Sequence, residues 1–201
     1  MSKIKLADYV ANYLLKNNLK IVYSVTGAGS MHFNDSIGTK KGMTVIYTHH
    51  EQAASMAAEG TARIIGRPGV VNVSTGPGGT NALTGVTCAW VDSIPLLVIS
   101  GQIMRKDRGP KHGLRQMGVQ EIDTISVAKN LTKYAVTIED PNSIKYHLDK
   151  ALYLSTSGKP GPVWIEIPLD VQSSFINPKK LKNFKPKKKK TKIFIKLFQK
   201  S

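Results

Sequence analysis

The chain has 201 residues, 41% of them hydrophobic, which is enough for one α/β domain with a full core but too few for two comfortable ones. No stretch approaches the roughly 20 apolar residues that span a bilayer, and the single cysteine, Cys88, excludes an internal disulfide, so we expect a cytoplasmic protein without a membrane partner. The net charge is +16, but 11 of the 29 basic residues are lysines of an acid-free tail (177–201). The rest of the chain has 18 basic groups against 13 acids and is only mildly basic, so we expect no nucleic-acid partner.

Helices and strands are predicted to alternate along most of the chain. In chain order, the apolar spacing predicts a helix over 4–15, strands over 21–25 and 43–47, a helix over 51–65, a strand over 69–75, a helix over 82–91, a strand over 94–100, a short helix over 121–128, a strand over 133–138, a helix over 141–155 and a strand over 163–168. Continuous apolar strands between helices predict an α/β fold, a three-layer parallel sheet with helices on both faces.

Three distinctive turns, at 27–30, 49–52 and 76–81, follow predicted strands. In parallel sheets the loops that leave the carboxyl ends of strands form the ligand crevice. We therefore expect these turns to converge in space.

The two glycine-rich turns match no phosphate-binding fingerprint. Gly27 and Gly29 follow a strand, but His32 stands where a dinucleotide motif has its third glycine, which favours a tight turn with positive φ. The stretch 76–81 lacks the Gly-Lys-Ser/Thr ending of a P-loop. Its three glycines around Pro77 indicate either close backbone approach to a ligand or subunit, or a plain strand-to-helix turn.

Glu51 raises three alternatives: a helix-start charge, a corner of a metal site, or a buried functional acid. His49, His50 and Glu51 are consecutive and residue 54 is alanine, so the spacing argues against a metal site and no metal ligand is predicted. A helix-start carboxylate is common, but the following "AASMAA" predicts a helix packed closely on all sides, and hence a half-buried acid.

The motifs then resemble a known family. In order, "TGAGS", "HEQAASMAAEG", "STGPGGTNALTG", "DSIPLLVISGQ", "VQEID" and "SGKPGPVWIEIPLDVQ" resemble the N-terminal, pyrimidine-binding domain of thiamine diphosphate (TPP) enzymes, closest to the acetolactate synthase large subunit. The resemblance runs from about residue 4 to residue 172 and implies a flavodoxin-like fold.

The resemblance also implies roles for particular residues. It gives Glu51 a catalytic contact with N1′ of the aminopyrimidine ring, which promotes loss of the thiazolium proton, and it places Gln120 near the reacting carbons at a subunit interface. The cofactor-binding residues that it implies are Thr26, Gly27, Ala28, Gly29, Glu51, Thr75, Pro77 and Asn81.

The implied reaction is decarboxylation of a 2-oxo acid followed by C–C bond formation, as in branched-chain amino acid biosynthesis. In the family, Mg²⁺ and the diphosphate are held by a C-terminal domain with a Gly-Asp-Gly…Asn-Asn motif, which these residues lack, so the chain is expected to be inactive alone. The expected partner is a second copy (a homodimer) or a diphosphate-binding domain or subunit. The alternatives are a non-catalytic truncated or split subunit that binds a homologous partner, and a 2-oxo acid decarboxylase or sugar-pathway carboligase of the same family.

Several positions depart from the family pattern. Val119 replaces a phenylalanine, which would reshape the acceptor pocket, and Lys159 replaces an arginine that touches FAD, which puts flavin binding in doubt. The basic residues of the loop over 101–118 allow acidic or phosphorylated acceptors, or form a solvated loop.

The predicted domain boundary follows residue 172. Residues 1–172 are expected to form the pyrimidine-binding domain, and residues 173–201 a disordered, Lys-rich linker and tail. The tail is interpreted as the product of an interrupted longer reading frame rather than as a basic arm for nucleic acid or a membrane surface.

Overall fold

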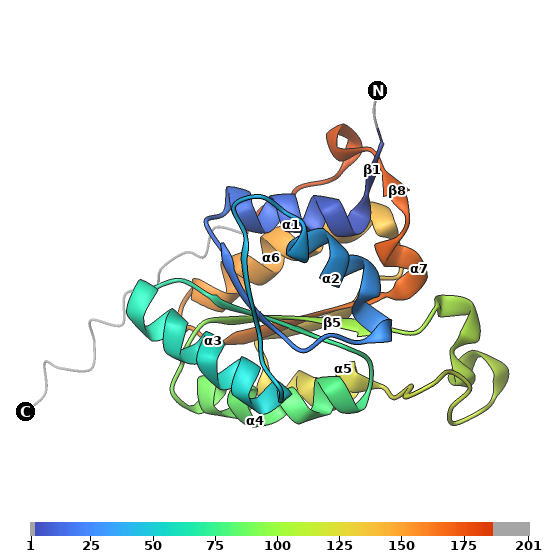
Figure 1. The fold of residues 1–201 in the computed structure, drawn as a ribbon, viewed down its shortest axis with the longest axis horizontal. Coiled ribbons are helices and arrows are strands. Elements are labelled where there is room, and N and C mark those ends of the chain that lie inside the picture. Colours follow the sequence, from blue (N-terminus) through green and yellow to red (C-terminus); the bar gives the residue numbers. More distant parts are fainter. Residues whose placement is uncertain (1–2, 187–201) are drawn as a thin grey trace, which may run out of the picture.

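A six-stranded parallel sheet covered by helices on both faces forms the body of the computed structural model, which describes residues 3–186 (Figure 1). Its strands are β2 (Ile21–Ser24), β3 (Thr44–Tyr47), β4 (Gly69–Val73), β5 (Leu96–Gln102), β6 (Tyr134–Thr137) and β7 (Pro162–Pro168). They lie in the order β3-β2-β4-β5-β7-β6, and every neighbouring pair is parallel. The predicted fold class is confirmed.

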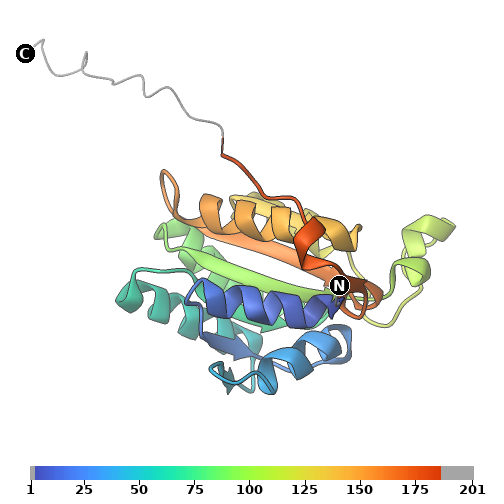
Figure 2. The ribbon, with the colours of Figure 1, turned by 90° about the horizontal axis from the view of Figure 1, so that it is seen from above.

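The helices divide between the two faces of the sheet (Figures 1 and 2). One face carries α1 (Leu6–Lys16), α2 (Met31–Gly38) and α6 (Ile144–Thr156), and the other carries α3 (Glu51–Ile65), α4 (Pro77–Val91) and α5 (Thr124–Ala128). A short helix, α7 (Leu169–Gln172), follows β7, and β1 (Ile4–Lys5) pairs with β8 (Phe175–Ile176) in a separate ribbon. The 3₁₀ turns are η1 (Ala28–Ser30), η2 (Arg105–Asp107), η3 (Gly109–His112), η4 (Lys129–Leu131), η5 (Pro141–Ser143) and η6 (Pro178–Lys180). No helix between residues 3 and 186 has the length and apolar character needed to cross a membrane.

The central strands are buried on both faces, which explains their continuous apolar character. In β5, Leu97 and Ile99 belong to the core under α1 and α6, whereas Leu96 and Val98 belong to the core under α3 and α4. Strand β7 repeats this alternation, and its Trp164 is fully buried on the α3 and α4 side.

Helices α3 and α4 approach each other closely through small residues. A Cβ on Gly85 of α4 would lie 2.3 Å from the Ser55 Oγ of α3, and the buried side of α3 consists of Ala54, Ser55, Ala58 and Ala62. The expectation that α3 is packed on all sides is wrong, because Met56 on its other side is 43% exposed.

Helices α4 and α2, which lie near the predicted turns, differ from the sequence prediction. Helix α4 begins at Pro77 and not at residue 82, so most of the predicted turn 76–81 is its first helical turn. Proline is favoured there because its φ is already helical and its missing N–H leaves no bond unmade. Helix α2 was not predicted, since its short polar sequence gives little helical signal, yet its Phe33 and Ile37 are buried one turn apart.

The segment after Gln172 contacts the domain. Strand β8 pairs with β1, Leu181 is only 9% exposed, and the ring of Phe184 lies against Tyr146 and Tyr153. The predicted boundary at residue 172 stays a prediction, and the expectations for the lysine run from 187 onward lie outside the described residues.

Candidate functional site

The three predicted turns converge at one edge of the sheet. Strand β2 lies between β3 and β4, so the connections around it run in opposite directions and leave a crevice at the carboxyl ends of the strands. There the Gly29 N–H, after β2, donates to the Ser74 Oγ, after β4, at 3.2 Å. Helix α3, which follows β3, is joined to helix α4, which follows β4, by the bond between Glu51 and Asn81 near their amino-terminal ends.

Close approach, and not positive φ, explains the glycines of the first turn. Gly27 has an extended φ of −173° and Gly29 is not among the positive-φ residues, so the predicted positive φ is wrong. A Cβ would lie 2.3 Å from the Ser74 Oγ if added to Gly27, and 1.8 Å from the Thr75 Oγ1 if added to Gly29. The two loops therefore pack backbone against side chain, which only glycine permits here.

A polar network holds the first turn from beneath. The Asn34 side chain, on α2, donates to the Gly27 carbonyl at 3.3 Å, and the buried Asn72 of β4 donates to the Asn34 Oδ1 at 2.5 Å and to the Ser24 Oγ at 2.8 Å. Sequence reasoning missed this support because it did not predict α2. The asparagine inside the apolar strand β4 was the available signal.

Glu51 and Asn81 connect the starts of α3 and α4. Glu51 is half-buried, as predicted, and its Oε2 accepts a hydrogen bond of 2.6 Å from the Asn81 Nδ2. The Asn81 Oδ1 in turn accepts from the Gln52 Nε2 at 3.2 Å, and its Nδ2 lies 3.4 Å from the His50 Nε2. The carboxylate is thus fixed in the first turn of α3, where the helix dipole favours a negative charge.

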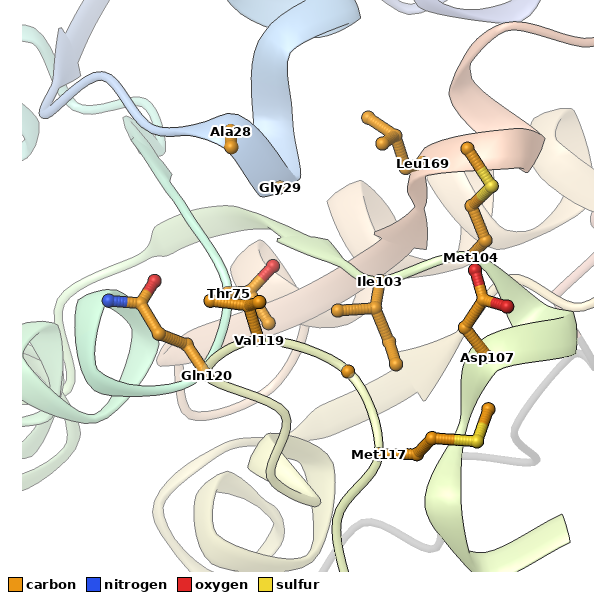
Figure 3. A pocket seen from close by; sticks show the side chains of 11 residues that line it. Ala28, Gly29, Thr75, Ile103, Met104, Asp107, Met117, Val119, Gln120 and Leu169 are labelled. Carbon is orange, nitrogen blue, oxygen red and sulfur yellow. The ribbon is translucent and has the colours of Figure 1, made fainter. Parts of the chain in front are cut away.

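A cavity of about 460 Å³ opens beside these loops (Figure 3). It is lined by Ala28, Gly29, Thr75, Ile103, Met104, Asp107, Met117, Gly118, Val119, Gln120 and Leu169. Thr75 is buried, and its hydroxyl has no hydrogen-bond partner among the described residues. A buried polar atom left unpaired beside a cavity is suited to a polar ligand.

Gln120 lines this cavity from a strained backbone. Its φ is +59°, which is uncommon for a residue other than glycine. Its carbonyl oxygen lies only 1.8 Å from where a Cβ on Gly76 would be, so the glycine after β4 is required for this contact. The Gln120 side chain points away from Ile103 and Met117 in Figure 3.

The predicted site residues are therefore only partly gathered in the cavity. Ala28, Gly29, Thr75 and Gln120 line it, whereas Glu51 and Asn81 form the neighbouring pair at the helix starts. Gly27 packs against Ser74 and is not part of the lining, and Thr26 and Pro77 are exposed to solvent. Sequence reasoning missed the apolar wall, which consists of Ile103, Met104, Met117 and Leu169; the methionines within a basic loop were its only signal.

A buried acid lies at the carboxyl end of β7. The Glu166 carboxylate accepts from the Thr137 Oγ1 at 2.9 Å and from the Gln102 Nε2 at 3.2 Å, and burial raises its pKa to about 7. Gln102 also donates to the Ile122 carbonyl at 3.0 Å, which ties this buried acid to the loop before α5.

Comparison with known proteins agrees with this geometry. The model of the family "Thiamine pyrophosphate enzyme, N-terminal TPP binding domain" matches residues 4–127. The chain is 35% identical over 185 residues to the acetolactate synthase large subunit of Haemophilus influenzae, covering 92% of this chain and 30% of that protein. It is 37% identical over 179 residues to the large subunit of Lactococcus lactis, covering 86% and 30%, and 32% identical over 172 residues to the chloroplastic acetolactate synthase of Arabidopsis thaliana, covering 86% and 25%.

The chain thus spans less than a third of the length of these relatives. The family match nevertheless covers more than half of its own residues, including the turns after β2, β3 and β4. The chain belongs to the family of thiamine pyrophosphate enzymes, as their N-terminal TPP-binding domain.

Proposed function

We propose that this domain is the pyrimidine-binding part of a thiamine diphosphate-dependent, acetolactate synthase-like carboligase. The observation that carries the proposal is the half-buried Glu51, held by Asn81 at the head of α3 beside a cavity lined by Gly29, Thr75 and Gln120. When bound, the cofactor supplies the electron sink for decarboxylation of a 2-oxo acid and for C–C bond formation.

The donor set fits an aminopyrimidine ring. Asn81 occupies the Glu51 Oε2, and among residues 3–186 no hydrogen bond occupies the Oε1, which is therefore free to hold or release a proton at a ring nitrogen. The unpaired Thr75 hydroxyl can bond a second polar atom of the ligand, and Gly29 lines the same cavity. Gln120 would contact the reacting part of the substrate.

The proposal requires a partner for the other end of the cofactor. Residues 3–186 place no group of three or more His, Cys, Asp or Glu side chains in reach of one metal ion, so Mg²⁺ and the diphosphate are assigned to another domain or subunit. Apolar side chains at the exposed side of α3 and the end of α4 support such pairing, with Met56 43%, Trp90 40% and Val91 68% exposed. No flavin is included, since Lys159 offers none of the planar bonding of an arginine.

The test compares the chain alone with the chain mixed with a separately expressed diphosphate-binding domain of a full-length relative. Thiamine diphosphate and Mg²⁺ binding is measured by calorimetry, and pyruvate decarboxylation by carbon dioxide release. We expect turnover only in the mixture, and Glu51→Gln should abolish it while leaving the circular dichroism spectrum unchanged.

Glu59→Gln is the matched control, because Glu59 lies on the same helix and, among residues 3–186, its carboxylate binds only Arg63. It should leave turnover unaltered. Near-normal activity of the Glu51→Gln mixture would show that the assignment of Glu51 is wrong. Cofactor binding by the mixture without any decarboxylation would favour a non-catalytic partner subunit.

A further inference from the structure

The loop between β5 and α5 projects from the end of the sheet and forms one wall of the cavity (yellow-green in Figures 1 and 2). It spans residues 103–123 and contains only the short turns η2 and η3. It also carries Gln120, whose left-handed backbone is unfavourable by about 1 kcal/mol or more unless the surroundings impose it. Something must therefore hold this loop in place.

The Glu121 carboxylate is at the centre of the loop. It is 5% exposed and accepts backbone N–H groups from three residues: Gly109 at 2.9 and 3.0 Å, Met117 at 3.0 Å and Gly118 at 3.1 Å. The three donors come from both ends of the segment 109–118, so one side chain closes it. Hydrogen bonds from backbone N–H to a buried carboxylate are among the stronger ones in proteins.

The glycines of the loop show how tightly it is closed. A Cβ on Gly109 would lie 2.8 Å from the backbone carbon of Gln116, and a Cβ on Gly118 would lie 2.2 Å from the Ile103 Cδ1. The residues fixed by this closure, Met117 and Gly118, directly precede Val119 and Gln120 in the lining of the cavity.

We propose that Glu121 is a positioning residue, whose carboxylate closes the segment 109–118 and thereby fixes the backbone of Gln120 and the Met117–Gln120 wall of the substrate cavity. Gln120 is held from its other sides by the contact of its carbonyl with Gly76, and by the bond from Gln102 to the carbonyl of Ile122. Only the catalytic consequence rests on the proposed function; the closure itself is a property of this chain.

The charge state of Glu121 agrees with this role. Burial acts to raise its pKa, but the bonds from Met117, Gly109 and Gly118, with the nearby Arg108 guanidinium, outweigh it and hold the pKa below its ordinary value. Glutamine at this position has the same shape but no charge. Its oxygen can take the place of the Oε2, which all three donors reach, but its N–H₂ group then replaces the Oε1 and faces the Gly109 N–H. The variant therefore weakens all three bonds by removing the charge of their acceptor, and it sets two donors against each other at Gly109.

The experiment follows amide exchange and backbone NMR shifts of the 201-residue chain in wild type and in Glu121→Gln. We expect the amides of Gly109, Met117 and Gly118 to exchange at least about tenfold faster in the variant, and the Cα shift of Gln120 to lose its left-handed value. The amide of Val98, in β5, should keep its protection and so report an intact fold.

The matched control is Glu139→Gln, which removes the same charge from a group that also contacts this loop, through Arg108. It should leave the three amides and Gln120 unchanged. Unchanged exchange in Glu121→Gln, or an equal loss in Glu139→Gln, overturns the proposal. If Glu121→Gln does not fold, an acid titration of the wild type decides: the three amides should shift together, with one pKa below that of an ordinary glutamate.

Enzyme kinetics distinguishes a residue that positions the wall of the substrate cavity from one that only stabilises the loop. In the mixture with the diphosphate-binding domain, Glu121→Gln should raise KM for the 2-oxo acid about tenfold with kcat within about threefold, unlike Glu51→Gln, which abolishes kcat. If the amides of the loop lose their protection in Glu121→Gln but KM is unaltered, Glu121 only stabilises the loop and its positioning role is overturned. If even the wild-type mixture is inactive, the proposed function fails. The amide-exchange experiment still tests whether Glu121 closes the segment 109–118.

Discussion

Glu166 shows most directly how the surroundings of one residue change its chemistry. In the sequence it is a single acid within the apolar strand "VWIEIP", and this apolar context is the one sign that the acid could be buried. In the fold it is 1% exposed and bonded to Thr137 and Gln102, and burial raises its pKa from 4.5 to about 7. The folded state therefore holds a proton that the unfolded state releases.

This predicts a pH dependence of stability with a definite sign. Between about pH 4.5 and pH 7 the native chain binds one proton more than the unfolded chain at this site, so its contribution to the free energy of unfolding falls as pH rises. In Glu166→Gln that loss is absent. The stability difference between wild type and variant should therefore change by about 3 kcal/mol in favour of the variant from pH 4.5 to pH 7.5.

Urea denaturation of both proteins across this pH range measures the difference. A constant difference would mean that Glu166 titrates normally despite its burial. Because Gln102 bonds both Glu166 and the Ile122 carbonyl, the same titration should shift the Gln102 side-chain NH₂ resonance.

At the scale of elements, the close contact of α3 and α4 positions Glu51 beside Asn81. The two helices meet where Gly85 lies over Ser55, with no room for a Cβ between them. Gly85→Ala places that Cβ 2.8 Å from the Met56 backbone nitrogen, so the helices must separate. We expect a loss of about 2 kcal/mol in the free energy of unfolding.

Gly60→Ala, in α3 itself, is the matched control. A Cβ there meets nothing within 4 Å, so this substitution should stabilise the chain by about 0.5–1 kcal/mol through helix propensity alone. Chemical denaturation compares the two variants. Stabilisation by both would show that the α3–α4 contact relaxes without cost.

The elements also show why some sequence predictions failed. Helix α3 and strands β4, β5 and β7 were predicted close to their observed bounds, because their apolar patterns are long or continuous. Helix α2 was missed because a short polar segment has no periodic signal of its own, and its Phe33 and Ile37 gain meaning only when the sheet is present. The start of α4 was placed late because three glycines disfavour a helix locally, whereas Pro77 and the contact with α3 impose one.

At the scale of the whole molecule, the segment after Gln172 returns to the amino-terminal end. The Leu6 N–H donates to the Ser174 carbonyl at 2.8 Å, β8 pairs with β1, and Ile176 is 2% exposed. This part of the predicted linker therefore closes the domain by joining the two ends of the described chain.

Truncation tests how much the segment after Gln172 contributes to stability. Ending the chain after residue 172 removes the buried side chains of Ile176 and Leu181 and the ring of Phe184, and should lower the free energy of unfolding by about 3 kcal/mol or more. Ending it after residue 186 keeps all these contacts and should not cause this loss. Urea midpoints of the two truncated chains decide this, and equal midpoints would support the predicted boundary at residue 172.

The sequence by itself determined the fold class, the family and the three turns at the ligand edge, because these depend on apolar periodicity and on local motifs that survive without tertiary context. It also pointed to Glu51, through its place at the head of a small-residue helix. Only the tertiary structure decided which residues share a cavity, why Gly27 and Gly29 are glycines, and that Asn81 holds Glu51. These facts depend on distances between residues 30 or more positions apart, and such distances exist only once the sheet has brought the loops after β2, β3 and β4 together.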